Sequence, residues 1–326
     1  MSKPLKIGVM GCANIAKRSL IPALIENKNF ELVAVASRSK EKADEFAALF
    51  NIKGVVSYES LLEEDIDAVY VPLPTGLHEE WVIKCIERGK HVLVEKSFGM
   101  DLVSTVRILD LALSRKIVAM ENFMFPYHNQ HEAVMSMLND GRIGKIRNFK
   151  ANFSFPPLAD DNFRYNSEVG GGAILDAAAY TVKAAQVFLG KELTFLSATM
   201  HFDSERNVDI LGSAHFVFDQ RIPIHLSWGF DNFYQCGVEI LGTKGKLTTN
   251  RTYTAPPGFE PSAIVETHGK VEEVKFPADD HFQKLLNEFY RTVEAGEYKN
   301  AAEEVKQQSF FLGEIQSKAK KYIYEK

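Results

Sequence analysis

The chain has 326 residues, of which 25% are charged and 45% hydrophobic, and its formal net charge is −5. This length suggests two domains, and the composition is that of an ordinary soluble globular protein. Because the balance is acidic and no long basic run is present, the sequence excludes an electrostatic surface for nucleic acid.

The cysteines and the N-terminal segment bear on the cellular compartment. Cys12, Cys85 and Cys236 are far apart and form no Cys-x-x-Cys pair, which argues against a disulfide framework or a structural zinc site. The first apolar stretch is too short for a signal peptide, and no run approaches the ~18 apolar residues that span a membrane. We therefore expect a cytoplasmic protein with no membrane partner.

Strand and helix patterns alternate through the first 125 residues. Short apolar, β-branched runs predict strands, and helical periodicity predicts the helices between them. The predicted strands are 5–11, 30–38, 66–74, 91–97 and 117–124, and the predicted helices are 15–28, 39–51, 78–89 and 101–116. This β-α-β rhythm predicts an α/β domain with a doubly wound parallel sheet, which we place at residues 1–124.

The rest of the chain, residues 125–326, has a different pattern. A predicted helix at 128–139 precedes a series of strands, and helical periodicity returns from His281 to Lys326. The predicted strands are 145–155, 193–202, 210–218, 222–230, 236–242 and 245–250. Because sequential strands with short turns are antiparallel, this half is predicted to be an α+β domain.

One face of that sheet is expected to make contacts between subunits. Phe216 and Phe218 are two residues apart and so share a strand face, and the same holds for Ile222 and Ile224. We expect both pairs to lie on an outer apolar face. An exposed apolar face usually marks a partner. We therefore expect a homodimer or homotetramer through the antiparallel sheet.

The segment GCANIA at 11–16 follows the first predicted strand and opens the first helix, where a dinucleotide-binding fingerprint belongs. Only the first glycine is present, and alanines hold the other two small positions. The helix start offers free N–H groups to a pyrophosphate. An ordinary strand-to-helix turn is the alternative. The residues expected to contact the cofactor here are Gly11, Cys12, Ala13, Asn14 and Ile15.

The end of the second predicted strand carries Ser37 and Arg38. Enzymes that prefer NAD usually have an acidic residue here, which binds the ribose 2′-hydroxyl. A hydroxyl and a guanidinium suit a 2′-phosphate instead. We predict NADP(H) over NAD(H), the alternative being a solvated surface arginine.

Two more loops follow parallel strands, at the edge of the sheet where ligands bind. The segment PLPTGLH offers Pro72, Leu73, Thr75 and His78, which either contact the dinucleotide or cap the next helix. The segment HVLVEKS places Glu95 and Lys96 at the end of a strand. A lysine there would point to the nicotinamide, or else reach solvent.

Together the motifs GCANIA, PLPTGLH, EKS and RYNSEVGGGAILDAAAY resemble the glucose–fructose oxidoreductase/inositol dehydrogenase-like family over nearly the whole chain. The resemblance implies a Rossmann domain followed by an α+β domain with a large open antiparallel sheet. It also implies a lysine near the nicotinamide. A glycine-rich turn would then open a helix whose Asp is followed, four residues later, by a proton-exchanging His or Tyr.

Three positions depart from that pattern. Ser97 replaces the family's proline, and a cis bond before a residue other than proline costs about 2.5–4 kcal/mol. Tyr180 replaces the usual histidine, and Lys183 stands where many members have an aspartate. A tyrosine at this position resembles the glucose–fructose oxidoreductase, dihydrodiol dehydrogenase and nucleotide-sugar 3-ketoreductase branches.

The resemblance gives the helix after Gly170–Gly172 a chemical role. Residues four apart share a helix face, so Asp176 and Tyr180 are expected to face one substrate. We predict that Tyr180 donates the substrate proton and that Lys96 lowers the pKa of its phenol from about 10. Tyr180 and Lys96 are also expected to bind substrate. A core tyrosine on an amphipathic helix is the alternative.

Further positions complete the predicted site. Arg164 matches the family's arginine before the glycines and is predicted, with Asn122, to contact the cofactor. Arg18 and Tyr234 are candidates for substrate binding. His128 and His131 have no clear third ligand, so no metal site is predicted.

The sequence therefore predicts an NADPH-dependent oxidoreductase that reduces a ketone of a sugar or sugar nucleotide. One alternative is an NADP-dependent dehydrogenase of free sugars or trans-dihydrodiols. Another, of a different class, is a non-catalytic protein that binds and senses NADP.

Overall fold

The computed structural model describes residues 3–324, which form two compact units. The first comprises the chain up to Phe123 together with Phe282–Ser309. The second comprises Met124–His281 together with the residues from Phe310 onward. The domain division after residue 124 stays a prediction, because compactness alone does not define an independently folding domain. Within the described residues, no helix is both long and apolar enough to cross a membrane.

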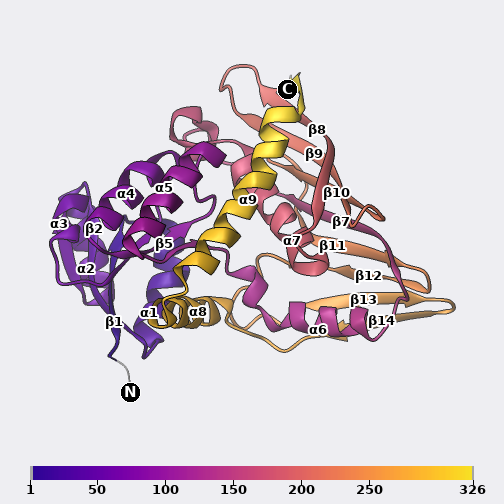
Figure 1. Ribbon diagram of the computed structural model, residues 1–326, viewed down its shortest axis with the longest axis horizontal. Helices are drawn as coiled ribbons and strands as arrows, with labels where there is room; N and C mark the ends of the chain where they lie inside the picture. The colour runs from indigo at the N-terminus through magenta and orange to yellow at the C-terminus, as the bar shows by residue number, and fades with distance from the viewer. Residues whose placement is uncertain (1–2, 325–326) are drawn as a thin grey trace. The chain divides into compact units, whose positions relative to one another are not determined.

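The first unit is built on a parallel sheet of six strands (Figure 1). In spatial order the strands are β3 (Lys53–Val56), β2 (Phe30–Ser37), β1 (Leu5–Met10), β4 (Ala68–Val71), β5 (His91–Glu95) and β6 (Ala119–Asn122). The order reverses beside β1, so the loops after β1 and β4 lie at the switch point where ligands bind in such sheets. The predicted doubly wound parallel sheet is confirmed.

Helices pack on both faces of this sheet. The helical segments are η1 (Ala16–Leu20), α1 (Ile21–Glu26), α2 (Lys40–Phe50), α3 (Tyr58–Leu62), η2 (Thr75–Leu77), α4 (His78–Glu87), α5 (Leu102–Arg115), α8 (His281–Ala295) and α9 (Tyr298–Lys318). One apolar core joins β4 and β5 to α3, α4, α5 and the first half of α9. On strand β2, Phe30 stacks on Phe289 of α8. The strands are therefore buried on both sides, which explains their nearly continuous apolar sequences.

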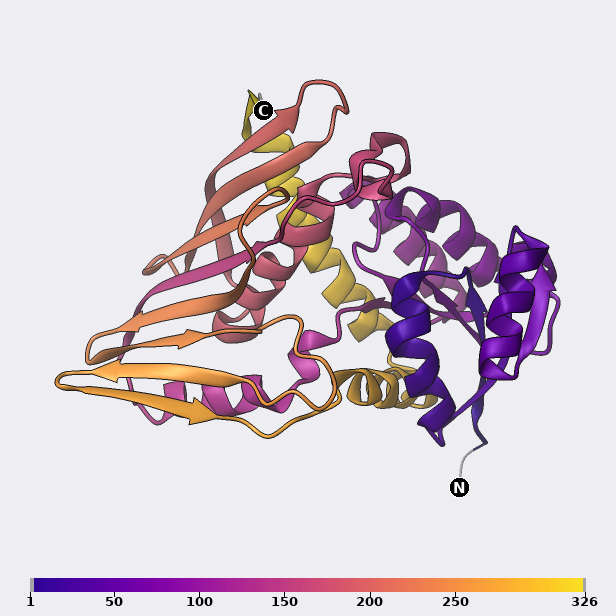
Figure 2. The same cartoon turned by 180° about the vertical axis from the view of Figure 1, so that it is seen from behind.

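The second unit contains one sheet of nine strands, which Figure 2 shows from behind. Its spatial order is β14 (Lys270–Lys275), β13 (Ser262–Thr267), β12 (Gly245–Thr249), β11 (Gln235–Gly242), β7 (Ile146–Ser154), β10 (Ile222–Gly229), β9 (Asp209–Phe218), β8 (Leu193–Asp203) and β15 (Lys320–Tyr324). Most neighbours are antiparallel, as predicted, but β7 with β10 and β8 with β15 are parallel.

Helices cover one face of this larger sheet. The helical segments of the unit are η3 (Phe125–Tyr127), α6 (Asn129–Asn139), η4 (Phe163–Tyr165), η5 (Ser167–Val169), η6 (Ile174–Ala178) and α7 (Ala179–Leu189). Helix α7 packs on β7 and β10, where Phe188 contacts Phe149 at a centroid distance of 6.0 Å. The last part of α9 adds Phe311, which contacts Phe216.

The residues expected to form an apolar outer sheet face lie on the covered face instead. Phe216 and Ile224 are 1% and 0% exposed. Phe218 and Ile222 share their side of the strands and pair with one another across β9 and β10. That prediction is wrong, because alternation shows which residues share a face but not which face the helices cover.

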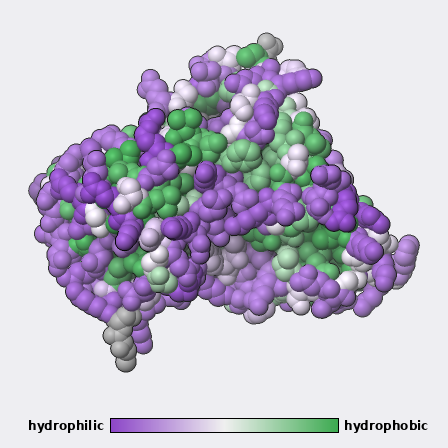
Figure 3. Space-filling view, in the orientation of Figure 1, coloured by the Kyte–Doolittle hydropathy of each residue, from purple (hydrophilic) through white to green (hydrophobic). Residues whose placement is uncertain are grey.

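The opposite face of β9 and β10 is more polar. It carries His215 and His225, whose rings lie 4.9 Å apart, and Ser213, whose hydroxyl is hydrogen-bonded to that of Thr199 on β8. Self-association through this sheet stays a prediction, without the apolar pattern that suggested it. Hydrophilic residues cover most of the face of the molecule in Figure 3, and hydrophobic residues gather in separate patches.

Four strands were not predicted: β3, β13, β14 and β15. They lie at or near the edges of the two sheets. Three of them are short and carry lysines or glutamates, as in Lys270–Lys275, so no apolar alternation marks them. Charged residues are common on edge strands because they discourage pairing with other chains.

Candidate active site

In the first unit, Gly11 directly follows β1 in a conformation that favours glycine. Its φ is +117°, and an added Cβ would lie 3.0 Å from Cδ2 of Leu73. Its N–H donates to the carbonyl of Ala36 at 2.9 Å, which ties the turn to the end of β2. Residues 12–15 lead from Gly11 into the π-helical turn η1, and Asn14 among them is exposed. The predicted fingerprint thus forms a strand-to-helix turn at the switch point of the parallel sheet.

The end of β2 gathers a thiol, a hydroxyl and two cations. Ser37 is buried, and its hydroxyl accepts a hydrogen bond from the N–H of Ser39 at 3.2 Å. Burial raises the pKa of the Cys12 thiol, whereas Ser37 and the charge of Lys42 lower it. Arg38 is exposed. Binding of a 2′-phosphate by Ser37 and Arg38 stays a prediction, and Lys42 is a further cation close to Cys12 that was not predicted from the sequence.

His78 contacts the backbone of the loop after β4. This side chain is fully buried, and its Nε2 lies 2.7 Å from the carbonyl oxygen of Leu73. Its Nδ1 lies 3.0 Å from the carbonyl oxygen of Ser97. Burial lowers the pKa of His78. The side chain caps neither neighbouring helix, so its described contacts join the loop after β4 to the loop after β5.

The structure brings Glu95 and Asn122 together at the ends of β5 and β6. Oε1 of Glu95 accepts a hydrogen bond from the Tyr70 hydroxyl at 2.6 Å and another from Nδ2 of Asn122. Burial raises the pKa of Glu95, opposed by these hydrogen bonds and by the charge of Lys96. Glu95 thereby fixes the strand end from which partly exposed Lys96 extends, and the Lys96–Ser97 peptide bond is cis.

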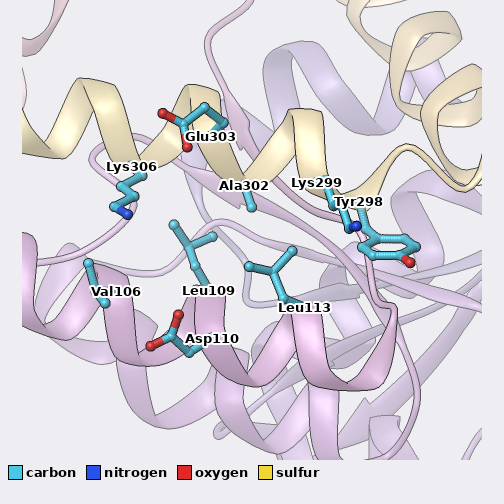
Figure 4. A pocket seen from close by; sticks show the side chains of 9 residues that line it. All are labelled: Val106, Leu109, Asp110, Leu113, Tyr298, Lys299, Ala302, Glu303 and Lys306. Carbon is cyan, nitrogen blue, oxygen red and sulfur yellow. The ribbon is translucent and has the colours of Figure 1, made fainter.

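Arg18, a predicted substrate contact, lies exposed on η1. A half-open cavity of about 340 Å³ lies elsewhere in the first unit, where α5 faces the start of α9 (Figure 4). Leu109, Leu113 and Ala302 line its floor, and charged side chains such as Asp110 and Lys306 stand at its rim. None of the predicted site residues lines this cavity.

In the second unit, the glycine-rich turn is fixed by a buried carboxylate. Gly172 has a φ of +116°, and a Cβ added there would collide with Oδ1 of Asp209. The other oxygen of Asp209 accepts a hydrogen bond from the N–H of Ile174 at 2.8 Å. Burial raises the pKa of Asp209 to about 7, although backbone hydrogen bonds such as that from Ile174 oppose the shift. Asp209 thus holds the start of the segment that carries Asp176 and Tyr180.

That segment begins as the π-helical turn η6 and becomes an α-helix at Ala179. Such turns are rare and often occur at functional sites. Asp176 is paired with Arg164: Nε of Arg164 lies 2.6 Å from Oδ2 of Asp176, and Nη2 lies 3.4 Å from Oδ1. Two predicted ligand-binding residues are therefore in contact with one another.

Tyr180 lies among aromatic rings. Its ring centroid is 4.9 Å from that of Phe153, 5.6 Å from that of Tyr253 and 5.9 Å from that of Phe125. The side chain is only 7% exposed. Contacts with three rings limit the positions that the phenol can adopt, which suits a group that must be aimed at a substrate.

Tyr234 belongs to a second cluster in this unit. Its hydroxyl lies 2.7 Å from Oγ1 of Thr254 and accepts a hydrogen bond from Nη1 of Arg251 at 3.1 Å. Arg251 and Asp209 were not predicted from the sequence, because only the fold brings each to its partner. An acidic residue at the start of a strand was the sole local signal for Asp209.

The histidines considered as metal ligands also have a neighbour that the sequence analysis missed. His281 lies beside His128, with a centroid distance of 5.8 Å, and His128 lies 6.4 Å from His131. Burial lowers the pKa of His131 to about 3, and its Nε2 lies 3.0 Å from the carbonyl oxygen of Thr252. Among residues 3–324, no group of three His, Cys, Asp or Glu side chains has the arrangement of a metal site.

The sequence matches known proteins along most of its length. It is 41% identical over 297 residues to dTDP-3,4-didehydro-2,6-dideoxy-α-D-glucose 3-reductase of Saccharopolyspora spinosa, covering 91% of this chain and 90% of that protein. It is 33% identical over 230 residues to trans-1,2-dihydrobenzene-1,2-diol dehydrogenase of Xenopus laevis, covering 70% of this chain and 68% of that protein.

The fold matches a solved structure, KijD10, a 3-ketoreductase from Actinomadura kijaniata in complex with NADP and TDP-benzene. The TM-score is 0.96, with 37% sequence identity over 99% of this chain and 100% of that chain. Variants of KijD10 with a tyrosine changed to phenylalanine, or a lysine changed to alanine, were also solved with both ligands. The sequence separation of those two residues equals that of Lys96 and Tyr180.

Two family models match successive parts of the chain. Residues 5–123 match the oxidoreductase family with an NAD-binding Rossmann fold, and residues 131–248 match the GFO/IDH/MocA C-terminal domain. The predicted family and oxidoreductase class are therefore confirmed. This chain belongs to the GFO/IDH/MocA family of oxidoreductases.

Proposed function

We propose that this protein is an NADPH-dependent 3-ketoreductase that acts on a thymidine-diphosphate-linked keto sugar. The observation that carries the proposal is the pair Lys96 and Tyr180, whose separation equals that of the two residues substituted in KijD10. Close relatives named as dTDP-sugar 3-reductases support the substrate class, and the NADP in KijD10 supports the cofactor.

The first unit supplies the proposed cofactor site. The turn that Gly11 opens would hold the pyrophosphate through the backbone amides of residues 12–15, and Ser37, Arg38 and Lys42 would hold the 2′-phosphate. The reduced nicotinamide, when bound, supplies a hydride to the carbonyl carbon. Glu95, fixed by Tyr70 and Asn122, would keep the start of the Lys96 loop in place.

The proposed proton donor, Tyr180, belongs to the second unit. Tyr180 would donate its phenolic proton to the ketone oxygen at C3, which leaves a hydroxyl on the sugar and a phenolate on the protein. A nearby ammonium favours that phenolate, so Lys96 would lower the pKa of the phenol toward the working pH. Solvent would then return the proton to Tyr180. Asp176, held by Arg164, would accept a hydrogen bond from a sugar hydroxyl.

A second candidate is an NADP-dependent dehydrogenase of trans-dihydrodiols. The 33% identity to the Xenopus laevis enzyme favours it, and so does a tyrosine at position 180, which the resemblance associates with that branch as well. A dihydrodiol has no diphosphate, so this candidate predicts indifference to dTDP.

The experiment is a substrate panel with purified protein, followed through the absorbance of NADPH. One arm supplies NADPH with dTDP-3,4-didehydro-2,6-dideoxy-α-D-glucose, and the others supply NADP with a trans-dihydrodiol or a free sugar. We expect turnover in the first arm, with reduction at C3 verified by mass spectrometry and NMR of the product. Faster turnover of the dihydrodiol would replace the first proposal with the second, and NADPH binding without turnover in any arm would favour a sensor.

A further inference from the structure

Arg251 lies in the loop between β12 and β13, and two aromatic rings hold its guanidinium. The guanidinium carbon is 5.0 Å from the ring centroid of Tyr234 and 5.9 Å from that of Phe259. Its Nη1 also donates to the Tyr234 hydroxyl at 3.1 Å, and Nε2 of Gln130 donates to its backbone carbonyl at 3.3 Å. Both the guanidinium and the backbone carbonyl of this exposed arginine therefore have partners.

The charge of this arginine is not neutralised. Across residues 3–324, the contacts of the Arg251 side chain are the Tyr234 hydroxyl and the two rings, and none of them is a carboxylate. Arg164, which was predicted to contact the cofactor, is paired with Asp176 at 2.6 Å. A guanidinium has five N–H donors, so Arg251 retains donors for an anion.

The loop of Arg251 is anchored beside the proposed proton donor. Tyr253, two residues further on, is fully buried and contacts Tyr180 at a centroid distance of 5.6 Å. It also contacts Phe153 at 5.2 Å. The loop that carries Arg251 therefore also supplies one ring to the aromatic cluster around Tyr180.

A flat apolar side chain is exposed one residue before Tyr234. Phe233 precedes Tyr234 in the loop between β10 and β11, and it is 86% exposed, more than any other large hydrophobic side chain described. Burying such a side chain against a flat partner is favourable. Nucleobases stack well on exposed phenyl rings.

We propose that Arg251 and Phe233 form the nucleoside-diphosphate subsite of this enzyme. Arg251 binds the diphosphate through its free donors, and Phe233 stacks on the thymine base. The choice of a sugar nucleotide as the ligand rests on the proposed function.

The test is calorimetric titration of the NADP-saturated protein with dTDP and, separately, with inorganic pyrophosphate. Arg251→Gln should weaken dTDP binding by about 10- to 100-fold, because charge-assisted hydrogen bonds are lost. It should weaken pyrophosphate binding as well. Phe233→Ala should weaken dTDP binding by about tenfold and leave pyrophosphate binding unchanged. Arg221→Gln, which changes an exposed arginine in the turn between β9 and β10, is the matched control.

The outcomes separate this inference from the proposed function, because binding is measured without turnover. If Arg251→Gln binds dTDP within about twofold of the unsubstituted protein, the inference is overturned even if the keto sugar is reduced. If the unsubstituted protein binds dTDP and Arg251→Gln does not, the inference stands even if no keto sugar is reduced. Should Arg251→Gln not fold, Arg251→Lys serves instead. It keeps the charge but loses the planar fork, and dTDP binding equal to that of the unsubstituted protein would overturn the inference.

Discussion

Asp209 accepts a hydrogen bond from the backbone N–H of Ile174 at 2.8 Å and so fixes the start of the helical segment that carries Asp176 and Tyr180. The contact joins β9 to a turn 35 residues earlier in the chain. Gly172 allows it, because any larger residue there would meet the same carboxylate. Because of this hydrogen bond and the absence of a side chain at Gly172, the orientation of the Tyr180 segment depends on the buried carboxyl of Asp209.

Removing that acid should loosen the segment. Asp209→Ala leaves the buried N–H of Ile174 without its partner, which costs about 1–3 kcal/mol of unfolding free energy. Urea denaturation measures this loss. Turnover should fall as well, because Tyr180 loses its fixed start, whereas NADPH binding to the first unit should not change. Unaltered stability and turnover would show that the contact is unimportant.

The same carboxyl should make stability depend on pH. Its pKa is raised to about 7 in the folded protein, above that of an unfolded aspartate, because burial disfavours the charged form. Between those two values the folded state binds more protons than the unfolded state, so stability contributed by Asp209 falls as pH rises and levels off above about 7.

Asp209→Asn, which does not titrate, isolates this contribution. The unfolding free energy of the unsubstituted protein minus that of Asp209→Asn should decrease from pH 5 to pH 8, as measured by urea denaturation at each pH. A difference that stays constant or grows over this interval would contradict the assignment of the raised pKa to Asp209.

Gly172→Ala should destabilise the folded protein more than an alanine substitution at a comparable glycine does. Gly141 also has a positive φ, +70°, but an added Cβ there would meet nothing within 4 Å. Gly141→Ala should therefore cost only about 1 kcal/mol of backbone strain. Gly172→Ala adds a collision with Asp209, so thermal unfolding should occur at a clearly lower temperature. An equal fall in unfolding temperature in the two variants would show that the Asp209 side chain moves aside without a loss of stability.

Cofactor preference should depend on Arg38. Arg38→Ala removes a guanidinium from the proposed 2′-phosphate site, so the KM for NADPH should rise about 10- to 100-fold while that for NADH stays nearly constant. Steady-state kinetics with both cofactors measure this. Arg88→Ala, at an exposed arginine paired with Glu63, is the control. A parallel rise for both cofactors would point to a general loss of binding instead.

The parallel sheet could be predicted because local patterns determine it, and the same patterns gave the candidate site at its strand ends, which stays a prediction. A small-residue turn after β1 and a lysine after β5 stand at strand ends, and strand ends meet at one edge of a parallel sheet. The number of residues between Lys96 and Tyr180 can be read from the sequence alone.

Long-range features could not be predicted. Asp209 and Arg251 carry no local motif, and only the fold brings them to Ile174 and Tyr234. The pairing of Arg164 with Asp176 was also missed, although both residues had been chosen separately as ligands. The sheet face of Phe216 was misassigned, because strand alternation has two solutions and helix packing selects one of them.

The most direct test of the account is the turnover of Tyr180→Phe with saturating NADPH and the dTDP-linked 3-keto sugar. The variant keeps the ring that packs on Phe153 and Tyr253 and loses only the hydroxyl. We predict a fall in kcat of roughly 10²–10⁴-fold, as expected for loss of a general acid, with dTDP and NADPH binding retained. A kcat close to that of the unsubstituted enzyme would contradict Tyr180 as the proton donor.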